Sequence, residues 1–381
     1  MRDQLRIGLF VHHHLVEGTG AAGVTLRLAE ELRARGHQVE VTGLELLGRL
    51  ATSPLAPLLF PAAVARRVTE QVRHHELDVV DASTGDLAWL PTSVLMRPEV
   101  ALLTRSHGLE PLVVAARRRG AAAGQLHLRR RYALYHGGWR LAEVRRSLQR
   151  CDQVLVLSAE EQRYVTTVLG RGIDTTTLIS NGLPASMDAA SPHPSTAPPG
   201  LVVLGDTSWR KATAVALEAI ALAVAPRPEI PVRWLGTGVD DRTARRMLPE
   251  PLRARAEVLE RYHAGDLPEL LRGAEILVMT ARVEGQPLTL LEAAACGLAA
   301  VATDIPGVRD VLEASGGGVL VPVDDAEAAA AAVTALLDDA DRLLALRIAA
   351  QQDARGRTWP KVAADLEATY RRVLQAKAAQ R

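Results

Sequence analysis

The chain has 381 residues, of which 48% are hydrophobic and 23% charged, a composition that supports a sizeable core and excludes a disordered protein. Its 45 basic and 44 acidic side chains leave a net charge of +1, so no global field attracts nucleic acid. At roughly 100 to 200 residues per domain, the length predicts two or three domains.

The amino terminus enters a strand-like run at once, residues 5–11, without the charged and long apolar regions of a signal peptide. No uncharged apolar stretch reaches the roughly 18 residues that span a bilayer. The two cysteines, Cys151 and Cys296, are too few for a disulfide framework or a zinc cluster. These features predict a cytoplasmic protein.

In the first half of the chain, short β-rich runs alternate with helical periodicity, which is typical of parallel sheets with crossover helices. Val24, Leu28 and Leu32 recur at helical spacing, and Gly36 is placed to end that helix. A segment at 184–199 is rich in Pro, Ser and Ala and has no period, which indicates a linker. The strands predicted before it are 5–11, 39–42, 77–81, 100–104 and 153–157.

Beyond the linker the alternation restarts, and an apolar stripe of helical period ends the chain, with Thr358 as its N-cap. Strands are predicted at 201–205, 231–235, 275–280, 299–302 and 319–321, and helices at 211–224, 267–273 and 287–296. The pattern predicts an α/β protein with two doubly wound Rossmann-like domains, 1–183 and 200–358, and a final helix at 359–381. Ligands of such sheets bind at the carboxyl ends of strands, which can face each other across a cleft.

A glycine-rich loop, Gly18-Thr19-Gly20-Ala21-Ala22-Gly23, precedes the first helix. Taken alone, this G-x-G-x-x-G favours a dinucleotide site and a nicotinamide-dependent oxidoreductase. Six residues separate it from the strand, however, and the acidic residue expected near the end of the second strand is missing, because Glu45 comes late. The loop therefore predicts either an anion site at a helix N-terminus or a tight turn that needs glycine.

Two glutamates, Glu284 and Glu292, stand eight positions apart around a helix start at Pro287. From Pro287 to Glu292 the helix rises roughly 7.5 Å. Such a pair could hold hydroxyl groups at either end of a diphosphate whose phosphates face the intervening amides. An ordinary acidic first turn of a solvated helix is the alternative.

The segment 276–323 resembles the C-terminal signature of the retaining glycosyltransferases of family four, which have the GT-B fold. Its matching residues are Glu284, Glu292, Cys296-Gly297, Ala302-Thr303-Asp304 and Gly307-Val308. Further matches are Arg105-Ser106-His107-Gly108, Ser180-Asn181-Gly182, Ser208-Trp209-Arg210-Lys211 and the glycine loop. These motifs cover nearly the whole chain in the family's order.

The resemblance implies a hexosyltransferase that uses a nucleoside diphosphate sugar and needs neither a cofactor nor a metal ion. It implies catalytic roles for His107 and Glu284. The donor-binding residues that it implies are Gly18, Gly20, Arg210, Lys211, Gly285, Gln286, Leu288, Thr289 and Glu292. Arg261 and Tyr262 are weaker candidates for contact with the base. Only three lysines occur, Lys211, Lys361 and Lys377, and neutralising a diphosphate would give Lys211 a purpose.

Some positions depart from the family's pattern. Gln286-Pro287 replaces the usual aromatic-glycine pair, so residue 287 has no amide to donate, and Asp206 stands where an arginine is common. A non-catalytic nucleotide-sugar-binding protein therefore remains an alternative. Asp339-Ala340-Asp341 falls in a predicted helix, and the consecutive side chains of His12, His13 and His14 diverge, so neither run predicts a metal site.

Between Arg105 and Arg150, eleven arginines stand against two acidic residues, Glu110 and Glu143. This segment could hold a phosphorylated or lipid-linked acceptor or rest on the inner face of an anionic membrane. Residues 50–65, which carry three prolines and Phe60 without a charge, could add apolar contact. Exposed helices of an arginine-rich protein are the alternative.

Overall fold

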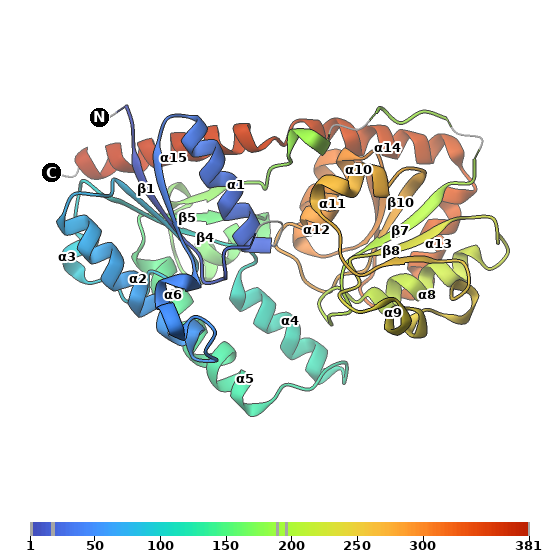
Figure 1. Ribbon diagram of the computed structural model, residues 1–381, viewed down its shortest axis with the longest axis horizontal. Helices are drawn as coiled ribbons and strands as arrows, with labels where there is room; N and C mark the ends of the chain where they lie inside the picture. The colour runs from blue at the N-terminus through green and yellow to red at the C-terminus, as the bar shows by residue number, and fades with distance from the viewer. Residues whose placement is uncertain (1–2, 17–19, 188–189, 195–196, 380–381) are drawn as a thin grey trace. The chain divides into compact units, whose positions relative to one another are not determined.

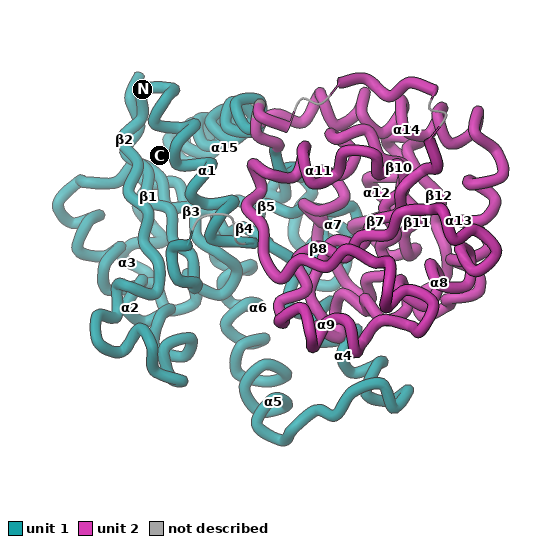
Figure 2. Tube along the Cα trace, turned by 45° about the vertical axis from the view of Figure 1, so that its right-hand side comes forward, with its two compact units in different colours: residues 1–182, 359–381 teal, residues 183–358 magenta. Residues whose placement is uncertain are grey.

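The computed structural model describes residues 3–16, 20–187, 190–194 and 197–379. It divides into two units, coloured separately in Figure 2. Unit 1 is Met1–Gly182 with Trp359–Arg381, and unit 2 is Leu183–Thr358. Residues 184–199, predicted as a linker, fall in unit 2, where Met187 is buried in the core.

The described part of unit 1 contains one sheet of six parallel strands in the order β2-β1-β3-β4-β5-β6. Its strands are β1 (Arg6–Phe10), β2 (Gln38–Thr42), β3 (Val79–Ser83), β4 (Ala101–Arg105), β5 (Gln153–Val156) and β6 (Thr176–Leu178). The short strand β6 escapes sequence prediction, because its Thr-Thr-Leu run carries no hydrophobic period.

Helices cover both faces of this sheet (Figure 1). On one face, Phe60 of α2 (Ala56–Arg73) and Val144 of α6 (Arg140–Arg150) pack with strand residues such as Val80. The other helices of unit 1 are α1 (Gly20–Ala34), α3 (Thr92–Leu95), α4 (Glu110–Ala122), α5 (Arg130–Leu134), α7 (Ala159–Arg163) and α15 (Trp359–Ala379).

The final helix α15 packs on unit 1 (Figure 1). Its Tyr370 hydroxyl donates to Asp81 Oδ2 of β3 at 2.6 Å, and Lys377 Nζ lies 2.8 Å from Asp152 Oδ2. Lys377, for which the sequence suggests no role, therefore ties the end of the helix to the loop before β5.

The described part of unit 2 also contains a six-stranded parallel sheet, in the order β12-β11-β10-β7-β8-β9. Its strands are β7 (Gly200–Leu204), β8 (Val232–Leu235), β9 (Glu257–Leu259), β10 (Ala274–Met279), β11 (Ala299–Thr303) and β12 (Gly318–Val321). The strands bury both faces: Val203 and Val278 join one core, and Val202 and Leu277 join the other.

The helices of unit 2 divide between these two cores (Figure 1). The first core takes α8 (Thr213–Val224), α9 (Asp241–Met247) and α13 (Ala326–Leu337). The second takes α10 (Leu267–Leu270), α11 (Leu288–Ala295), α12 (Pro306–Ser315) and α14 (Ala340–Arg355). Two doubly wound α/β units are thereby confirmed.

The strand order reverses once in each sheet. Strand β1 lies between β2 and β3, and β7 lies between β8 and β10. Ligands of open parallel sheets bind at the carboxyl ends of the strands that flank such a reversal. The turns after β1 and β3, and those after β7 and β10, are therefore the places where a site is expected.

Three helix starts differ from the sequence prediction. Ala212 adopts a left-handed φ of 48°, so α8 begins at Thr213 and leaves Lys211 in the preceding turn. Pro287 is the N-cap of α11 rather than a residue of its first turn. Asp339 caps α14 by accepting from Arg342 N at 2.9 Å, which gives that acidic pair a structural purpose.

Candidate functional site

The turn after β7 positions two predicted basic residues, Arg210 and Lys211. Asp206 Oδ1 accepts from Ser208 N at 2.9 Å, and Thr213 Oγ1 donates to the Asp206 carbonyl at 2.6 Å. Burial opposes ionisation of Asp206, but the Ser208 hydrogen bonds and the charges of Arg210 and Lys211 outweigh it and lower its pKa. The aspartate that departs from the family's pattern thus folds the turn.

Glycine at the end of β7 lets the lysine lie along the backbone. Gly205 has a φ of +144°, and a Cβ there would lie 3.2 Å from Lys211 Cδ. The Lys211 side chain is consequently 13% exposed, whereas that of Arg210 is 43% exposed.

Both cations converge on Glu284, in the loop after β10. Arg210 Nη1 lies 2.5 Å from Glu284 Oε2, and Lys211 Nζ lies 2.9 Å from Oε1. The Glu284 side chain is 8% exposed. The structure therefore brings together three predicted residues from the two strands that flank the reversal.

Arg282, which the sequence analysis missed, fixes the turn after β7 against the loop after β10. Its amide donates to the Arg210 carbonyl at 2.8 Å, and its Nη1 donates to the Trp209 carbonyl at 2.8 Å. Its Nε pairs with Asp324 at 2.7 Å, and its guanidinium lies over the Trp209 ring at 5.2 Å from the centroid. Its place two residues before Glu284 in the same loop is the only sequence signal for it.

The start of α11 offers backbone donors beside Glu284. The first helical hydrogen bond runs from Leu290 N to Pro287 O at 3.2 Å, so the amides of Leu288 and Thr289 precede it. Thr289 Oγ1 is buried and has no hydrogen-bond partner among the described residues. Such an orphaned hydroxyl is costly unless a ligand or water satisfies it.

A second glycine allows close packing behind this loop. A Cβ on Gly307, in the first turn of α12, would lie 1.9 Å from the Gly285 carbonyl oxygen. Any other residue at 307 would push the 284–285 backbone away. Gly307 belongs to the Gly-Val motif of the sequence, and this contact is its physical reason.

Glu292 lies one turn and more along α11. Burial raises the pKa of Glu292 to about 7, although the positive charge of Lys211 opposes the rise. No hydrogen bond from another described residue to its carboxylate is present. Burial raises the pKa of Cys296 to about 12 and that of Tyr262 above its ordinary value, and the negative charge of Glu292 adds to both shifts.

Tyr262 and Arg261, the two weaker candidates for contact with the base, differ in their surroundings. The Tyr262 ring packs against the end of β8, where a Cβ on Gly236 would lie 2.9 Å from Tyr262 Cε1. Arg261 is 86% exposed and lies 3.6 Å from Glu260, so it points into solvent.

In unit 1, His107 follows β4 in a tightly held loop. Ser106 Oγ and Leu109 N both donate to Glu161 Oε1, at 2.9 and 2.8 Å. Burial, with the charges of Arg105, His12 and His13, lowers the pKa of His107 well below its ordinary value. Its Nε2 is buried without a hydrogen-bond partner among the described residues, so the ring is a neutral, unsatisfied imidazole.

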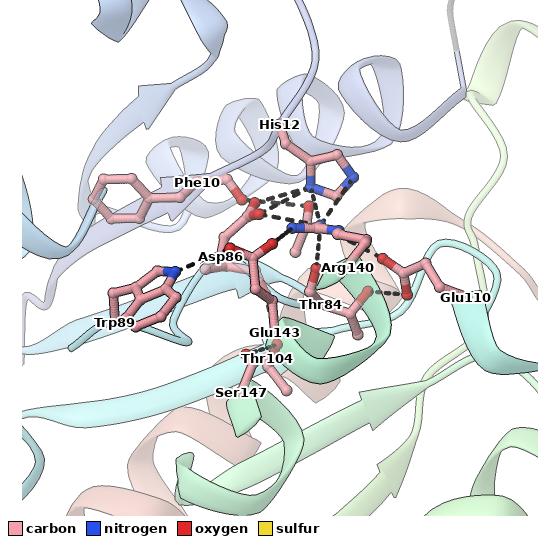
Figure 3. Close-up of polar contacts among 12 residues, drawn as sticks. Phe10, His12, Thr84, Asp86, Trp89, Thr104, Glu110, Arg140, Glu143 and Ser147 are labelled. Atoms are coloured by element: carbon pink, nitrogen blue, oxygen red, sulfur yellow. Dashed lines mark hydrogen bonds and ion pairs between the residues drawn. The ribbon is translucent and has the colours of Figure 1, made fainter. Parts of the chain in front are cut away.

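A polar cluster at the strand reversal of unit 1, centred on Arg140, also went unpredicted (Figure 3). Its guanidinium donates to the Thr84 carbonyl at 2.6 Å and lies 3.3 Å from Asp86 Oδ1. His12 Nδ1, after β1, lies 3.0 Å from Asp86 Oδ2. Gly85, with a φ of +89°, makes room, because a Cβ there would lie 2.6 Å from Arg140 Nη1.

The glycine loop is only partly described. Gly18 lies outside the described residues, and Gly20 is the first residue of α1, with a φ of +28°. Glu45, the late acidic residue, bonds to His14 Nδ1 at 3.0 Å and accepts from Leu15 N at 3.2 Å. It therefore orders the loop after β1, and no observation favours a nicotinamide site.

Two further searches concern metals and membranes. No group of three or more His, Cys, Asp or Glu side chains that could hold a metal ion occurs among the described residues. In the described chain, no helix has the length and apolar character needed to cross a bilayer.

Two family models match the sequence: "Glycosyltransferase Family 4" over residues 18–186 and "Glycosyl transferases group 1" over 198–339. A curated relative, D-inositol 3-phosphate glycosyltransferase from Thermobispora bispora, is 33% identical over 185 residues, which are 46% of this chain and 43% of the relative. The chain thus spans less than half the length of the curated relatives that it matches.

Solved structures resemble the whole chain. Sucrose-phosphate synthase from Thermosynechococcus elongatus superposes with a TM-score of 0.75 at 19% identity, covering 97% of this chain and all of that one. Anabaena HepE, solved in complex with UDP and glucose, gives a TM-score of 0.67 at 17% identity, covering 96% of this chain and 99% of that one. At these identities the likeness concerns the fold.

Proposed function

Because the chain belongs to the group 1 glycosyltransferases and has their GT-B fold, we propose that it transfers a sugar from a nucleoside diphosphate sugar to a hydroxyl group. The proposal includes retention of configuration at the transferred carbon and independence of a metal ion. The observation that carries it is the pairing of Arg210 and Lys211 with the buried Glu284 at the strand reversal of unit 2.

This arrangement suits a diphosphate. Two cations on one carboxylate leave a net positive charge beside the amides of Leu288 and Thr289, and an anion is favoured at such a helix start. Lys211 is a compact ammonium that can approach a phosphate oxygen whose charge grows as the bond to the sugar breaks. The exposed Arg210 can reach the more distant phosphate.

The glutamates suit the two ends of the donor. Glu284 would accept hydrogen bonds from hydroxyls of the transferred sugar while Lys211 holds its other oxygen, and Thr289 Oγ1 would gain the partner that it lacks. Glu292, with no competing hydrogen bond among the described residues, would accept from the ribose hydroxyls. Tyr262 would lie against the base of the donor.

The proposed retention does not use a covalent intermediate on Glu284. Glu284 is engaged by two cations, which makes it a poor nucleophile for a covalent sugar intermediate. In the proposed step the bond from the anomeric carbon to the diphosphate oxygen breaks and the bond to the acceptor oxygen forms on the same face. The acceptor's proton passes to the departing phosphate oxygen, and Arg210 and Lys211 stabilise the charge that remains.

In unit 1, the neutral His107 is assigned to a hydroxyl group of a substrate. Its lowered pKa means that the ring is a neutral imidazole rather than an imidazolium near neutral pH, so it acts as a hydrogen-bond partner rather than as an acid. The orphaned Nε2 supports this assignment.

The test measures release of nucleoside diphosphate from UDP-, GDP-, ADP- and dTDP-sugars in the presence of EDTA. UDP-glucose comes first because HepE binds UDP and glucose, and D-inositol 3-phosphate is the first acceptor because the curated relatives are named for it. We expect acceptor-dependent release that EDTA leaves unchanged, with a product of the donor's anomeric configuration by NMR.

Three results would count against the proposal. Activity that EDTA removes and Mn²⁺ restores would contradict metal independence, and an inverted product would contradict retention. Donor binding without turnover on a broad acceptor panel would favour a non-catalytic binding protein. Glu284→Gln, with an unchanged melting temperature and no turnover, is the control that ties the activity to this site.

A further inference from the structure

Nine arginines of segment 105–150 have no carboxylate partner among the described residues. Arg105 pairs with Asp81, and Arg140 forms ion pairs with both acidic residues of the segment, Glu110 and Glu143. The remaining arginines are 117, 118, 119, 129, 130, 131, 145, 146 and 150. In unit 2, Arg227 has an acidic partner, whereas no ion pair joins Arg242 or Arg246 to a carboxylate among the described residues. The nine arginines of unit 1 are therefore available to an anion from outside this unit.

Part of this excess lines a cavity of about 710 Å³ in unit 1. The walls come from the start of α2, from α4, from the loop before α5 and from α5 with the turn that follows it. The lining residues are Pro54, Leu55, Leu58, Arg117, Leu126, His127, Leu128, Arg129, Arg131, Tyr132, Tyr135 and His136. The volume is within the roughly 300 to 1,000 Å³ that small-molecule sites occupy.

The lining combines two chemistries. Its apolar part holds four leucines, and Leu55 is 56% exposed and Leu58 37% exposed. Its polar part is basic, and none of its described residues is acidic. The leucines favour a hydrocarbon chain, which gains roughly 0.8 kcal/mol for each buried methylene.

Contacts within the walls hold the basic residues in place. The Arg117 guanidinium lies 5.1 Å from the centre of the Tyr132 ring, which stacks on His136 at 4.8 Å. Arg118 Nη2 donates to the Gly137 carbonyl at 3.2 Å and ties α4 to the turn after α5. Arg129 and Arg131 are exposed. The cavity therefore combines apolar side chains with exposed cations.

We propose that this cavity binds a single phosphate-headed lipid. The phosphate lies at Arg117, Arg129 and Arg131, and the hydrocarbon chain lies against Leu55 and Leu58. The site belongs to unit 1 alone and needs neither the donor residues of unit 2 nor glycosyl transfer. Lipid binding at this cavity is therefore independent of the proposed function.

The test is titration calorimetry with dihexanoyl phosphatidylglycerol below its micelle concentration. Parallel titrations use dihexanoyl phosphatidylcholine and inorganic phosphate. We expect one molar equivalent of phosphatidylglycerol to bind, with an affinity that falls as salt is added. We expect phosphatidylcholine to bind at least about tenfold more weakly, since its choline cancels the negative charge of its phosphate. We expect the same of inorganic phosphate, which has no hydrocarbon chain.

Two double variants separate the halves of the site. Arg129→Gln with Arg131→Gln, and Leu55→Ser with Leu58→Ser, should each weaken phosphatidylglycerol at least about tenfold. Arg242→Gln with Arg246→Gln, on two exposed arginines of α9, should bind like the parent protein. Thermal melts check that each variant folds.

Several outcomes would overturn the proposal. Absence of phosphatidylglycerol binding to the parent protein would do so directly. If inorganic phosphate bound as tightly as phosphatidylglycerol, the cavity would be a plain anion site. If the leucine variant bound phosphatidylglycerol as tightly as the parent protein, the hydrocarbon chain would not lie against Leu55 and Leu58. Equal losses in the α9 control would show a general charge effect.

Discussion

Each sheet carries a charged cluster where its strand order reverses, and the two clusters hold opposite excesses of charge. In unit 2, two cations, Arg210 and Lys211, share Glu284. In unit 1, Arg140 faces Asp86, Glu110 and Glu143. The Arg210 side chain is 43% exposed, whereas that of Arg140 is 7% exposed.

The difference separates a binding cluster from a structural one. Excess cations that reach solvent can accept an anionic ligand, as Arg210 and Lys211 are proposed to do. The buried Arg140 already pairs with three carboxylates and cannot bind a further anion. Its loss would leave the negative charges of those carboxylates uncompensated in the interior. We therefore propose that the same position in two similar sheets serves two purposes, which the proportion of charges and their exposure distinguish.

The largest effect on stability is expected from Arg140→Met. Because Asp86 and Glu143 would remain buried without their partner, we expect unit 1 to lose about 3 to 5 kcal/mol of unfolding free energy. Denaturant unfolding followed by tryptophan fluorescence measures it, since Trp89 and Trp139 both donate to Glu143.

The matched control is Arg145→Met, an exposed position on the same helix α6. It should change the unfolding free energy by no more than about 0.5 kcal/mol. If the two variants unfolded at the same denaturant concentration, the Arg140 cluster would not be a structural one.

Lys211→Met should produce the converse result in unit 2. Loss of a cation at the departing phosphate is expected to lower kcat by about 100- to 1,000-fold. The melting temperature should change little, because Arg210 still pairs with Glu284. Lys361→Met, at an exposed position on α15, is the control and should keep the parent kcat. A normal kcat in Lys211→Met would remove this residue from the proposed mechanism.

The smallest effect is a pH dependence of donor affinity. Ionised Glu292 is needed to accept the ribose hydrogen bonds, and its pKa of about 7 makes the donor bind about tenfold more weakly near pH 6 than near pH 8. Glu292→Gln should bind more weakly at all pH values and lose this dependence. A parent affinity that stays flat across the range would contradict the raised pKa.

The same pKa has a consequence for stability. The folded value of about 7 lies above the ordinary 4.5, so the folded chain holds this proton more tightly than the unfolded one. The contribution of Glu292 to stability is therefore full below about pH 4.5 and falls as the pH rises through about 7. Thermal melts of the parent and of Glu292→Gln should converge at low pH.

Much of the fold was predictable because its signals are local. The alternation of strands and helices placed most strands within two residues, and the stripe ending at Val373 predicted α15. The strands β6 and β9 have three residues each and carry too short a period to recognise. The start of α8 was misplaced because the left-handed conformation of Ala212 has no sequence signal.

The candidate site was predictable only in part. The motifs indicated Arg210, Lys211, Glu284 and Glu292, but nothing in the pattern showed that both cations share one glutamate. Arg282 and Arg140 were missed for the same reason, since an arginine in an arginine-rich chain has no distinguishing composition around it.

The sequence by itself determined the two doubly wound units, the family and the residues of the proposed donor site, because strand alternation and motif spacing depend on near neighbours. Only the tertiary structure decided which charges meet. Arg210 and Glu284 lie 74 positions apart, and Arg140 and His12 lie 128 apart. Parallel strands bring such distant turns to one edge of a sheet, and burial there decides which arginines are held by carboxylates and which can accept a ligand.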